Sequence, residues 1–371
     1  MEITVLCKVV DNFGDIGVCW RLCMQLKKKY PEIILNLVVQ GLDSFKKIWN
    51  EVCESLVFQK ICGINVYDWN NFDFCYKEFS ENQNRLQVIL ECFQCGRPDW
   101  LEKILFDDNL THTVQIIMID YLTAEKYAED FHKLKSLTRR AKVQKVNFMP
   151  GFTEKTGGLI IDQNWQTLKP RNKNGEVLFF TYDKPQKFWI SFFKGAEKSG
   201  FDKKIMIAQG NGADSLKKSL EEFNKKNHKK FDFENLSFLN QNDWDILMQN
   251  CSSLVIRGEE SMSRACLSGL PFIWHAYPQS DEYQIVKMNA LLERMERHFS
   301  DFDFEIISKM WTIFNSPAEN LTENEIEDAA FLWFTNIEKL VPGFFDFSKS
   351  LINNGDLVSN LMTFINQIYI I

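Results

Sequence analysis

Residues 3–30 read ITVLCKVVDNFGDIGVCWRLCMQLKKKY and decide the fold class. The first part predicts a strand, the glycine-containing stretch 9–17 predicts a tight loop, and 18–30 predicts a helix. In nucleotide-binding proteins, a loop between a strand and a helix usually holds a phosphate. This loop instead carries two carboxylates, Asp11 and Asp15, and no lysine. It therefore suits a cation, or a group that must lose a proton, better than a phosphate.

Strand-like and helix-like stretches alternate along most of the chain. A basic, aperiodic stretch, KLKSLTRRAKVQK (133–145), and turn-rich residues up to about 175 interrupt the alternation, which then restarts. The segments expected to be strands are 34–41, 86–93, 114–122, 177–182, 204–210, 236–240, the first half of 252–261, and 270–277; those expected to be helices are 42–52, 185–199, 215–230, 243–251, 262–269 and 357–371.

This alternation predicts the α/β class, with parallel sheets covered by helices on both faces. We expect two Rossmann-like domains that face each other across a cleft. The N-terminal domain is expected over 1–165 and the C-terminal domain over 170–349, with the helical stretch 350–371 packing back on the first. Ligands of such sheets bind beyond the carboxyl ends of the strands, where the strand order reverses.

Composition and charge exclude several classes of protein. The 371 residues are 45% hydrophobic and 25% charged, which is typical of a soluble globular protein. Because the net charge is −7 and neither half is strongly basic, we expect no nucleic-acid partner. We find no signal-peptide pattern and no apolar stretch of the ~20 residues needed to cross a bilayer. The expected location is cytoplasmic, without a membrane partner.

The cysteines also indicate a reducing compartment. Ten are scattered along the chain, as free thiols of a cytosolic protein would be. Cys92 and Cys95 have the spacing of a redox or zinc pair, but no second pair and no histidine cluster completes a zinc site. We interpret them as two unlinked thiols near a turn, and we expect neither a metal nor a cofactor.

A second strand–loop–helix stretch, SSLVIRGEESMSRACLSG (252–269), has the chemistry that the first one lacks. Arg257 can make a bidentate contact to phosphate, and Ser261, near a helix start, can bind an anion with its hydroxyl beside backbone N–H groups. The alternative is an ordinary helix N-terminus with a capping serine and a surface Arg–Glu pair. A cationic acceptor at the first loop and a diphosphate at the second is the division of ligands in a two-domain glycosyltransferase.

Five segments, in the same order, resemble the EarP family, bacterial protein-arginine rhamnosyltransferases that modify elongation factor P. They are VVDNFGDIGVCWRL (9–22), IDYLTAE (119–125), PGFTEKTGGL (150–159), IRGEESMSRA (256–265) and PFIWHAYPQ (271–279). The resemblance implies a GT-B fold and inverting transfer of L-rhamnose from dTDP-β-L-rhamnose to one arginine of elongation factor P. It implies no metal or redox cofactor. Residues 40–115 contain nothing diagnostic.

The resemblance also implies roles for single residues. Asp11, Asp15 and Glu259 match the family's catalytic carboxylates. The residues that match its donor-nucleotide contacts are Tyr182, Phe238, Arg257, Gly258 and Ser261. Glu260 stands where the family has an aspartate and keeps the charge. Weaker candidates are Asn12, Phe13, Gly14 and Gly17 in the first loop, and Gln279 and Asp281, which could reach sugar hydroxyls.

An arginine acceptor accounts for the acidic loop. A guanidinium has a pKa above ~12 and is a poor nucleophile, because its lone pair is delocalised. Two carboxylates on one loop can hold the cation and accept its proton as the N–C bond forms. Asp15 is the expected base, and Asp11 is expected to position the acceptor or to share in catalysis.

Other interpretations stay open on local pattern alone. Asp11 could make an Asx-turn and Asp15 could cap the helix. Tyr182 and Phe238 could be core residues, and His275 is more simply a structural histidine than a base. Glu259 could bind a donor hydroxyl, orient Arg257 or assist the acceptor. For the whole protein, the alternatives are a GT-B enzyme with another acceptor and a non-catalytic protein that binds a nucleotide sugar or elongation factor P.

Overall fold

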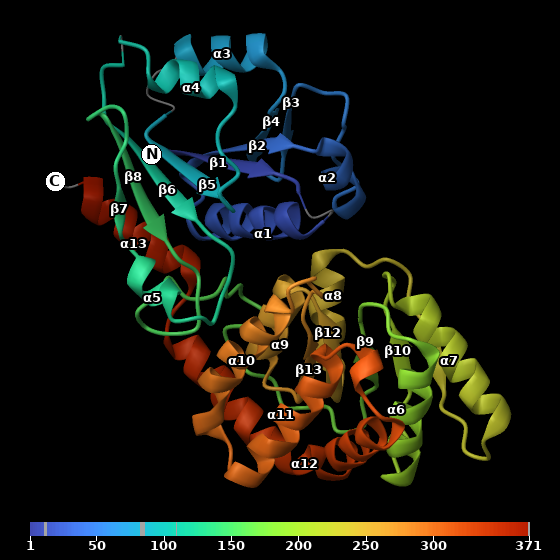
Figure 1. Cartoon of the computed structure of the whole chain (residues 1–371). Coiled ribbons are helices and arrows are strands. Elements are labelled where there is room, and N and C mark those ends of the chain that lie inside the picture. Colours follow the sequence, from blue (N-terminus) through green and yellow to red (C-terminus); the bar gives the residue numbers. More distant parts are fainter. Residues whose placement is uncertain (11–12, 82–85, 109, 370–371) are drawn as a thin grey trace. The chain divides into compact units, whose positions relative to one another are not determined.

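The computed structural model describes residues 1–10, 13–81, 86–108 and 110–369. The chain forms two compact units, coloured along the sequence in Figure 1. Unit 1 consists of Met1–Asp162 together with Asn354–Ile371, and unit 2 is Gln163–Asn353. For comparison, the domains expected from the sequence span 1–165 and 170–349.

Unit 1 is built on an eight-stranded sheet in the order β3-β4-β2-β1-β5-β6-β8-β7. All neighbours pair in parallel except β3 with β4 and β7 with β8, at the two edges. The order runs outward from β1 in one direction and from β5 in the other, so it reverses between these two strands. The strands are β1 (Glu2–Lys8), β2 (Ile34–Gln40), β3 (Phe58–Ile61), β4 (Ile64–Asp68), β5 (Val88–Cys92), β6 (Val114–Ile119), β7 (Lys135–Ser136) and β8 (Val143–Phe148).

Helices cover both faces of this sheet (Figure 1). The buried apolar residues of α1 and α13 share one core with the sheet, and those of α3 and α4 share a second core on the other face. Both faces of the central strands are therefore apolar, as expected for a parallel sheet. The helices of unit 1 are α1 (Gly14–Lys29), α2 (Leu42–Ile48), α3 (Phe72–Glu81), α4 (Asp99–Leu105), α5 (Tyr127–Phe131) and α13 (Leu357–Tyr369).

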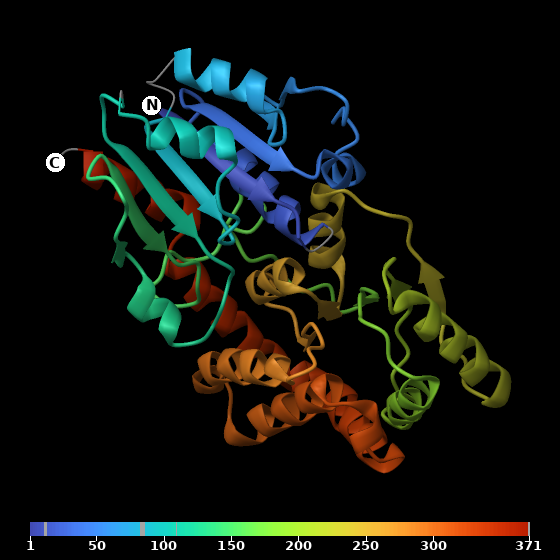
Figure 2. The same cartoon turned by 45° about the horizontal axis from the view of Figure 1, so that its top comes forward.

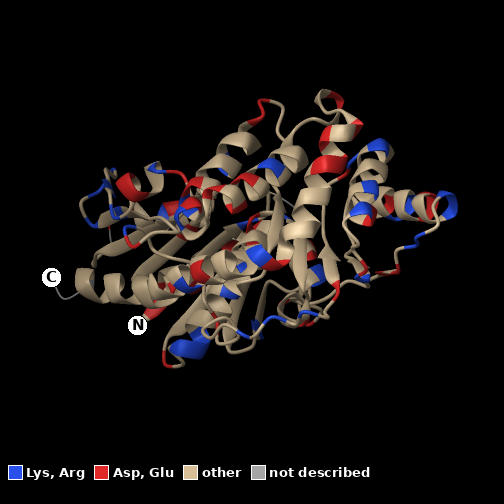
Figure 3. Cartoon of the chain, turned by 90° about the horizontal axis from the view of Figure 1, so that it is seen from below, with Lys and Arg blue, Asp and Glu red and all other residues tan. Residues whose placement is uncertain are grey.

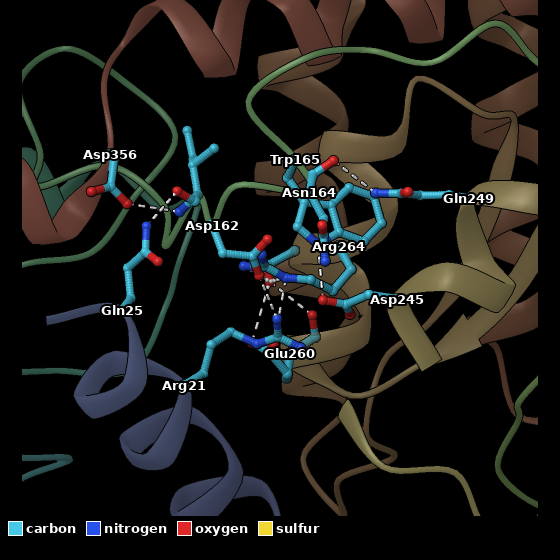
Figure 4. Close-up of polar contacts among 12 residues, drawn as sticks. Arg21, Gln25, Asp162, Asn164, Trp165, Asp245, Gln249, Glu260, Arg264 and Asp356 are labelled. Atoms are coloured by element: carbon cyan, nitrogen blue, oxygen red, sulfur yellow. Dashed lines mark hydrogen bonds and ion pairs between the residues drawn. The ribbon is translucent and has the colours of Figure 1, made fainter. Parts of the chain in front are cut away.

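The C-terminal helix α13 is held by the turn-rich segment 150–161 (Figures 2 and 4). Asp356, just before α13, accepts hydrogen bonds from Ile161 N–H and from the Lys29 ammonium, both over 2.8 Å. Gly158 has φ +85°, and a Cβ there would lie 2.6 Å from the Gly355 carbonyl, so glycine is required. The PGFTEKTGGL motif therefore has a structural role within unit 1, where it packs against the segment that precedes α13.

Unit 2 has a five-stranded parallel sheet in the order β11-β10-β9-β12-β13, which reverses between β9 and β12. Its strands are β9 (Val177–Phe179), β10 (Ile205–Ile207), β11 (Phe233–Asn235), β12 (Ser253–Arg257) and β13 (Phe272–His275). Its helices are α6 (Gln186–Lys198), α7 (Ala213–Lys226), α8 (Gln241–Asn250), α9 (Glu259–Ser268), α10 (Tyr283–Met295), α11 (Asp301–Asn315) and α12 (Glu323–Asn353), with short 3-10 turns at Glu296–His298 and Ala318–Asn320.

The N-terminal segment of unit 2 is tied to α8 by polar contacts (Figure 4). The Trp165 indole N–H donates to Asp245 Oδ2 over 3.0 Å, and Gln249 donates to the Asn164 carbonyl over 2.9 Å. Both Trp165 and Asp245 are buried, so this contact replaces the water that the two polar groups lose.

Three sequence predictions of local structure are wrong. Residues 236–240 form no strand: β11 ends at Asn235, and Asn240 instead caps α8 by accepting a hydrogen bond from Asp243 N–H over 3.0 Å. The basic stretch 133–145 is not purely irregular, because β7 and the start of β8 lie in it. The first helix begins at Gly14 and not at residue 18, so the first loop is shorter than expected.

Charged residues of both signs are interspersed along the ribbon (Figure 3), in keeping with the modest net charge of −7. Among the helices of the described residues, none is both long enough and apolar enough to span a membrane.

Candidate active site

Asp15 lies in the first turn of α1, in a buried position where the strand order of the unit 1 sheet reverses. Only 2% of Asp15 is exposed. Its Oδ2 accepts a hydrogen bond from Val10 N–H over 2.8 Å, and its Oδ1 accepts one from the Tyr121 hydroxyl over 3.1 Å. The carboxylate therefore bridges the ends of β1 and β6.

The structure rules out the helix-cap interpretation of Asp15. The N-cap of α1 is Phe13, which makes no side-chain capping bond, and Asp15 lies inside the first turn. Gly14 and Gly17 belong to α1, where Gly17 N–H donates to the Phe13 carbonyl. The Phe13 side chain is 41% exposed. Asp11 and Asn12 lie outside the described residues.

Tyr121 and Phe93, which the sequence did not single out as candidates, lie beside Asp15. Their rings stack with centroids 4.5 Å apart and planes 20° apart, beside the Asp15 carboxylate. Phe93 follows β5 and Tyr121 follows β6, so both lie at the same sheet edge as the first loop. Their position directly after strands was the available signal, because ligands of parallel sheets bind at that edge. Cys92 and Cys95, on either side of Phe93, are free thiols in a tight turn, as expected.

In unit 2, Arg257 ends β12 at the reversal point of the sheet, close to two aromatic rings. Its guanidinium carbon lies 4.5 Å from the Phe180 ring centroid and 4.6 Å from that of Tyr182. A Cβ on Gly210, after β10, would lie 2.7 Å from Arg257 Nη2. Residues at the ends of three strands thus lie around this cation.

The loop after Arg257 presents the start of a helix. Gly258 is the N-cap of α9 with φ +72°, a conformation that glycine adopts without strain, and no side chain caps the helix. Ser261 is the third residue of α9 and not its cap, and its hydroxyl bonds to no group in the part of the chain that the structure describes. The uncapped first turn offers backbone N–H groups to an anion.

Each of the two glutamates at this helix start has a cationic neighbour. The Lys287 ammonium lies 2.8 Å from Glu259 Oε1, and Arg264 Nε lies 3.4 Å from Glu260 Oε1. Within the described residues Glu259 is paired with Lys287 and not with Arg257. The interpretation that Glu259 orients Arg257 therefore has no support. Each of these carboxylates therefore has a positive side chain beside it at the start of α9.

Tyr182 is half-buried and is positioned by His275. The Tyr182 backbone N–H donates to His275 Nδ1 over 3.3 Å, and the two rings meet edge to face at 5.3 Å. Since Nδ1 accepts, the proton of the neutral ring is on Nε2. Burial, reinforced by Lys184 and Arg257, holds the pKa of His275 well below its usual value. His275 is a neutral structural histidine, as expected.

The remaining predicted residues are spread along the same edge. Phe238 lies between β11 and α8 and is 55% exposed, so it is not a core residue. Gln279 and Asp281 are exposed in the segment after β13, where Gln279 N–H donates to Gln284 and Asp281 accepts from Tyr283 N–H. No ring contact joins Phe238 to another described aromatic residue. In the described part of the chain, no group of three or more His, Cys, Asp or Glu could hold a metal ion.

Comparison with known proteins identifies the family of the chain. The sequence profile of the family described as "Elongation-Factor P (EF-P) rhamnosyltransferase EarP" matches residues 3–366. The chain belongs to the EarP family. It is therefore a glycosyltransferase, and specifically a rhamnosyltransferase, as the sequence motifs indicated.

Curated EarP-family relatives match over most of their length. A protein-arginine rhamnosyltransferase of Shewanella oneidensis is 28% identical over 321 residues, which cover 78% of this chain and 79% of the relative. The enzyme of the same name from Neisseria meningitidis serogroup B is 27% identical over 311 residues, covering 78% of each chain.

Solved structures support the fold of this EarP-family chain. One solved structure is described as "Structural basis for EarP-mediated arginine glycosylation of translation elongation factor EF-P". It aligns with TM-score 0.58 and 18% identity, over 99% of both chains. Anabaena Alr3699/HepE, solved with UDP and glucose, aligns with TM-score 0.50 and 10% identity over 100% of both. The α/β fold is of the GT-B class, which confirms the predicted fold class.

Proposed function

We propose that this EarP-family enzyme transfers L-rhamnose from dTDP-β-L-rhamnose to an arginine side chain of elongation factor P, with inversion at the anomeric carbon. The observation that carries the proposal is the pair of oppositely charged sites. A fixed carboxylate, Asp15, lies at the reversal point of one sheet, and a fixed guanidinium, Arg257, lies at that of the other.

The acceptor is assigned to unit 1 because Asp15 is buried but hydrogen-bonded. Its two oxygens are held by Val10 N–H and the Tyr121 hydroxyl, so the carboxylate cannot turn away from a substrate. A positioned carboxylate is suited to a group that carries a positive charge and must release a proton. Asp11 is proposed to help hold the guanidinium.

The donor is assigned to unit 2. Arg257 and the first turn of α9, with Gly258 and Ser261, would bind the diphosphate, and Tyr182 and Phe238 would contact the thymine. Glu259 lies at the same helix start, in an ion pair with Lys287, and is proposed to accept a hydrogen bond from a donor hydroxyl. Gln279 and Asp281 are proposed as further sugar contacts. No metal or other cofactor is part of this proposal.

The transfer balances without a further reactant. A guanidinium nitrogen attacks the anomeric carbon as the C–O bond to the diphosphate breaks. The proton of that nitrogen passes to the Asp15 carboxylate, and dTDP leaves with the bonding electrons, stabilised by Arg257. Displacement from the opposite side inverts the anomeric carbon. Because the acceptor is a translation factor, we place the reaction in the cytoplasm.

The experiment that tests the proposal is intact-mass measurement of elongation factor P after incubation with the enzyme and dTDP-rhamnose, in EDTA. We expect one added deoxyhexose, and none when a UDP-sugar replaces the donor or when the acceptor arginine is changed to alanine. Unmodified elongation factor P, or modification at another residue type, would overturn the assignment.

A further inference from the structure

The turn after β5 holds two adjacent residues in an unusual backbone conformation. Phe93 and Gln94 have φ +57° and +52°, and Cys95 N–H closes the turn on the Cys92 carbonyl over 3.1 Å. Positive φ at both central positions defines a type I′ turn, which glycine and asparagine favour. A bulky phenylalanine in this conformation is an outlier, and such outliers persist where the surrounding structure holds them, often near functional sites.

The turn places the Phe93 ring against Tyr121. Phe93 N–H donates to the Ile119 carbonyl over 2.7 Å, which ties the turn to the end of β6. The half-buried Phe93 side chain packs on the core beneath α1, and its ring stacks on Tyr121 at 4.5 Å. The Tyr121 hydroxyl in turn donates to Asp15 Oδ1 over 3.1 Å. Phe93 therefore fixes the tyrosine ring, and the tyrosine fixes the carboxylate.

Tyr121 is also partly exposed to solvent. One ring face is covered by Phe93, yet 40% of the residue is exposed, directly beside the Asp15 carboxylate. A planar guanidinium can stack on an aromatic face while it donates hydrogen bonds to a carboxylate at its edge. A tyrosine ring and a fixed carboxylate side by side provide both contacts.

We propose that Tyr121 is a positioning residue for Asp15 and also the ring on which the guanidinium of the acceptor arginine lies, with Phe93 as its support. The inference rests on the proposed function, since that function makes an arginine the acceptor. It adds a residue that determines specificity, because the Tyr121 ring favours a planar guanidinium as the acceptor.

The test compares three variants in steady-state rhamnosylation of elongation factor P by dTDP-rhamnose. Tyr121→Phe keeps the ring and loses the hydroxyl, so kcat should fall about 10- to 100-fold with the acceptor KM unchanged. Tyr121→Leu also loses the ring, so the acceptor KM should rise about 3- to 30-fold in addition. Tyr127→Phe is the matched control. Tyr127 is 42% exposed and its ring meets Phe131 at 6.1 Å, so its kinetics should be those of the wild type.

The outcomes separate this inference from the function on which it rests. A wild-type enzyme that adds no deoxyhexose overturns both. An active wild type with an unchanged kcat in Tyr121→Phe, or an unchanged acceptor KM in Tyr121→Leu, overturns only the role of Tyr121. Melting temperature and dTDP affinity are measured for each variant. Equal losses of kcat in Tyr121→Phe and Tyr127→Phe would likewise contradict the proposal.

Discussion

At the scale of single residues, Arg257 differs from a surface arginine because two aromatic rings from the segment after β9 lie close to its guanidinium. Contact with the rings of Phe180 and Tyr182 restricts the guanidinium, which helps to orient its N–H groups. A lysine has neither the planar fork nor the stacking surface, so it is not a conservative replacement here.

We therefore predict that Arg257→Ala weakens dTDP binding by roughly 1.5–3 kcal/mol and that Arg257→Lys restores only part of this loss. Isothermal calorimetry with dTDP measures both. Arg139→Ala is the matched control, because the Arg139 guanidinium lies 4.1 Å from the Phe106 ring in unit 1. Equal dTDP affinity in Arg257→Ala and Arg139→Ala would remove Arg257 from the donor site.

Lys184 carries a charge that is costly to bury. It is 7% exposed and its ammonium donates to the Ser316 carbonyl over 2.9 Å. Burial lowers the pKa of Lys184 from 10.5 to about 8, against an opposing effect of Glu319. Between these two values the unfolded chain holds a proton that the folded chain lacks, so the contribution of Lys184 to the free energy of unfolding rises with pH.

Lys184→Met should therefore be more stable than the wild type at pH 7, by roughly 1–3 kcal/mol. Its advantage should shrink above pH 8, by at most about 1.4 kcal/mol per pH unit. Denaturant unfolding of both proteins at pH 7, 8, 9 and 10 measures the difference. A difference that does not change with pH would show that Lys184 does not lose its proton in this range.

At the scale of elements, both sites lie where the strand order of a sheet reverses. Asp15 follows β1 and Phe93 follows β5, while Arg257 ends β12 and Tyr182 follows β9. Side chains and loops from neighbouring strands converge at such points. The loop after β10 also shapes this site. Gly210 has no side chain, which leaves room for the Arg257 guanidinium.

Gly210→Ala should displace Arg257 without unfolding unit 2. The new Cβ would lie 2.7 Å from Arg257 Nη2, the flexible end of a side chain that can move aside. We expect dTDP affinity to fall about ten-fold with little change in melting temperature. In an Arg257→Ala background, Gly210→Ala should leave the dTDP affinity almost unchanged, because the guanidinium that it displaces is absent. Additive losses in the double variant would mean that Gly210 acts independently of Arg257.

The sequence predicted the strands that carry the sites because they are buried on both faces and read as apolar runs. It could not predict β8, whose VQKVNF pattern has polar residues, with only the two-residue β7 beside it at the sheet edge. The position of Tyr121 after a strand was a signal, but its hydrogen bond to Asp15, which joins residues 106 positions apart, could not be predicted. Contacts of this kind depend on strand order, which periodicity does not encode.

At the scale of the whole molecule, each unit has its own sheet and its own site. Unit 1 is completed by residues 354–371, whose apolar side chains Leu357, Val358, Leu361, Met362 and Ile365 lie in its core. Unit 2 is one continuous segment. Binding of dTDP and binding of elongation factor P should therefore each affect a different unit.

Hydrogen exchange followed by mass spectrometry can measure which segments each ligand protects. We predict that dTDP slows exchange at 180–182, 208–212 and 257–262 in unit 2 and leaves 13–17 and 120–122 unaffected. Binding slows exchange where it stabilises local structure against opening. Elongation factor P alone should do the reverse. Protection of 13–17 by dTDP, without protection of 257–262, would contradict the division of ligands between the units.

The most direct test of the account is the single-turnover rate of Asp15→Asn at saturating elongation factor P and dTDP-rhamnose. The amide oxygen can still accept from Val10 N–H, and the Tyr121 hydroxyl can accept from the new amide, so the fold should survive with a nearly unchanged melting temperature. Dissociation constants for dTDP should also be unchanged. As the amide cannot accept the proton, we predict a fall in rate of at least ~10²-fold. A folded Asp15→Asn enzyme that transfers rhamnose at the wild-type rate would show that this carboxylate is not the base.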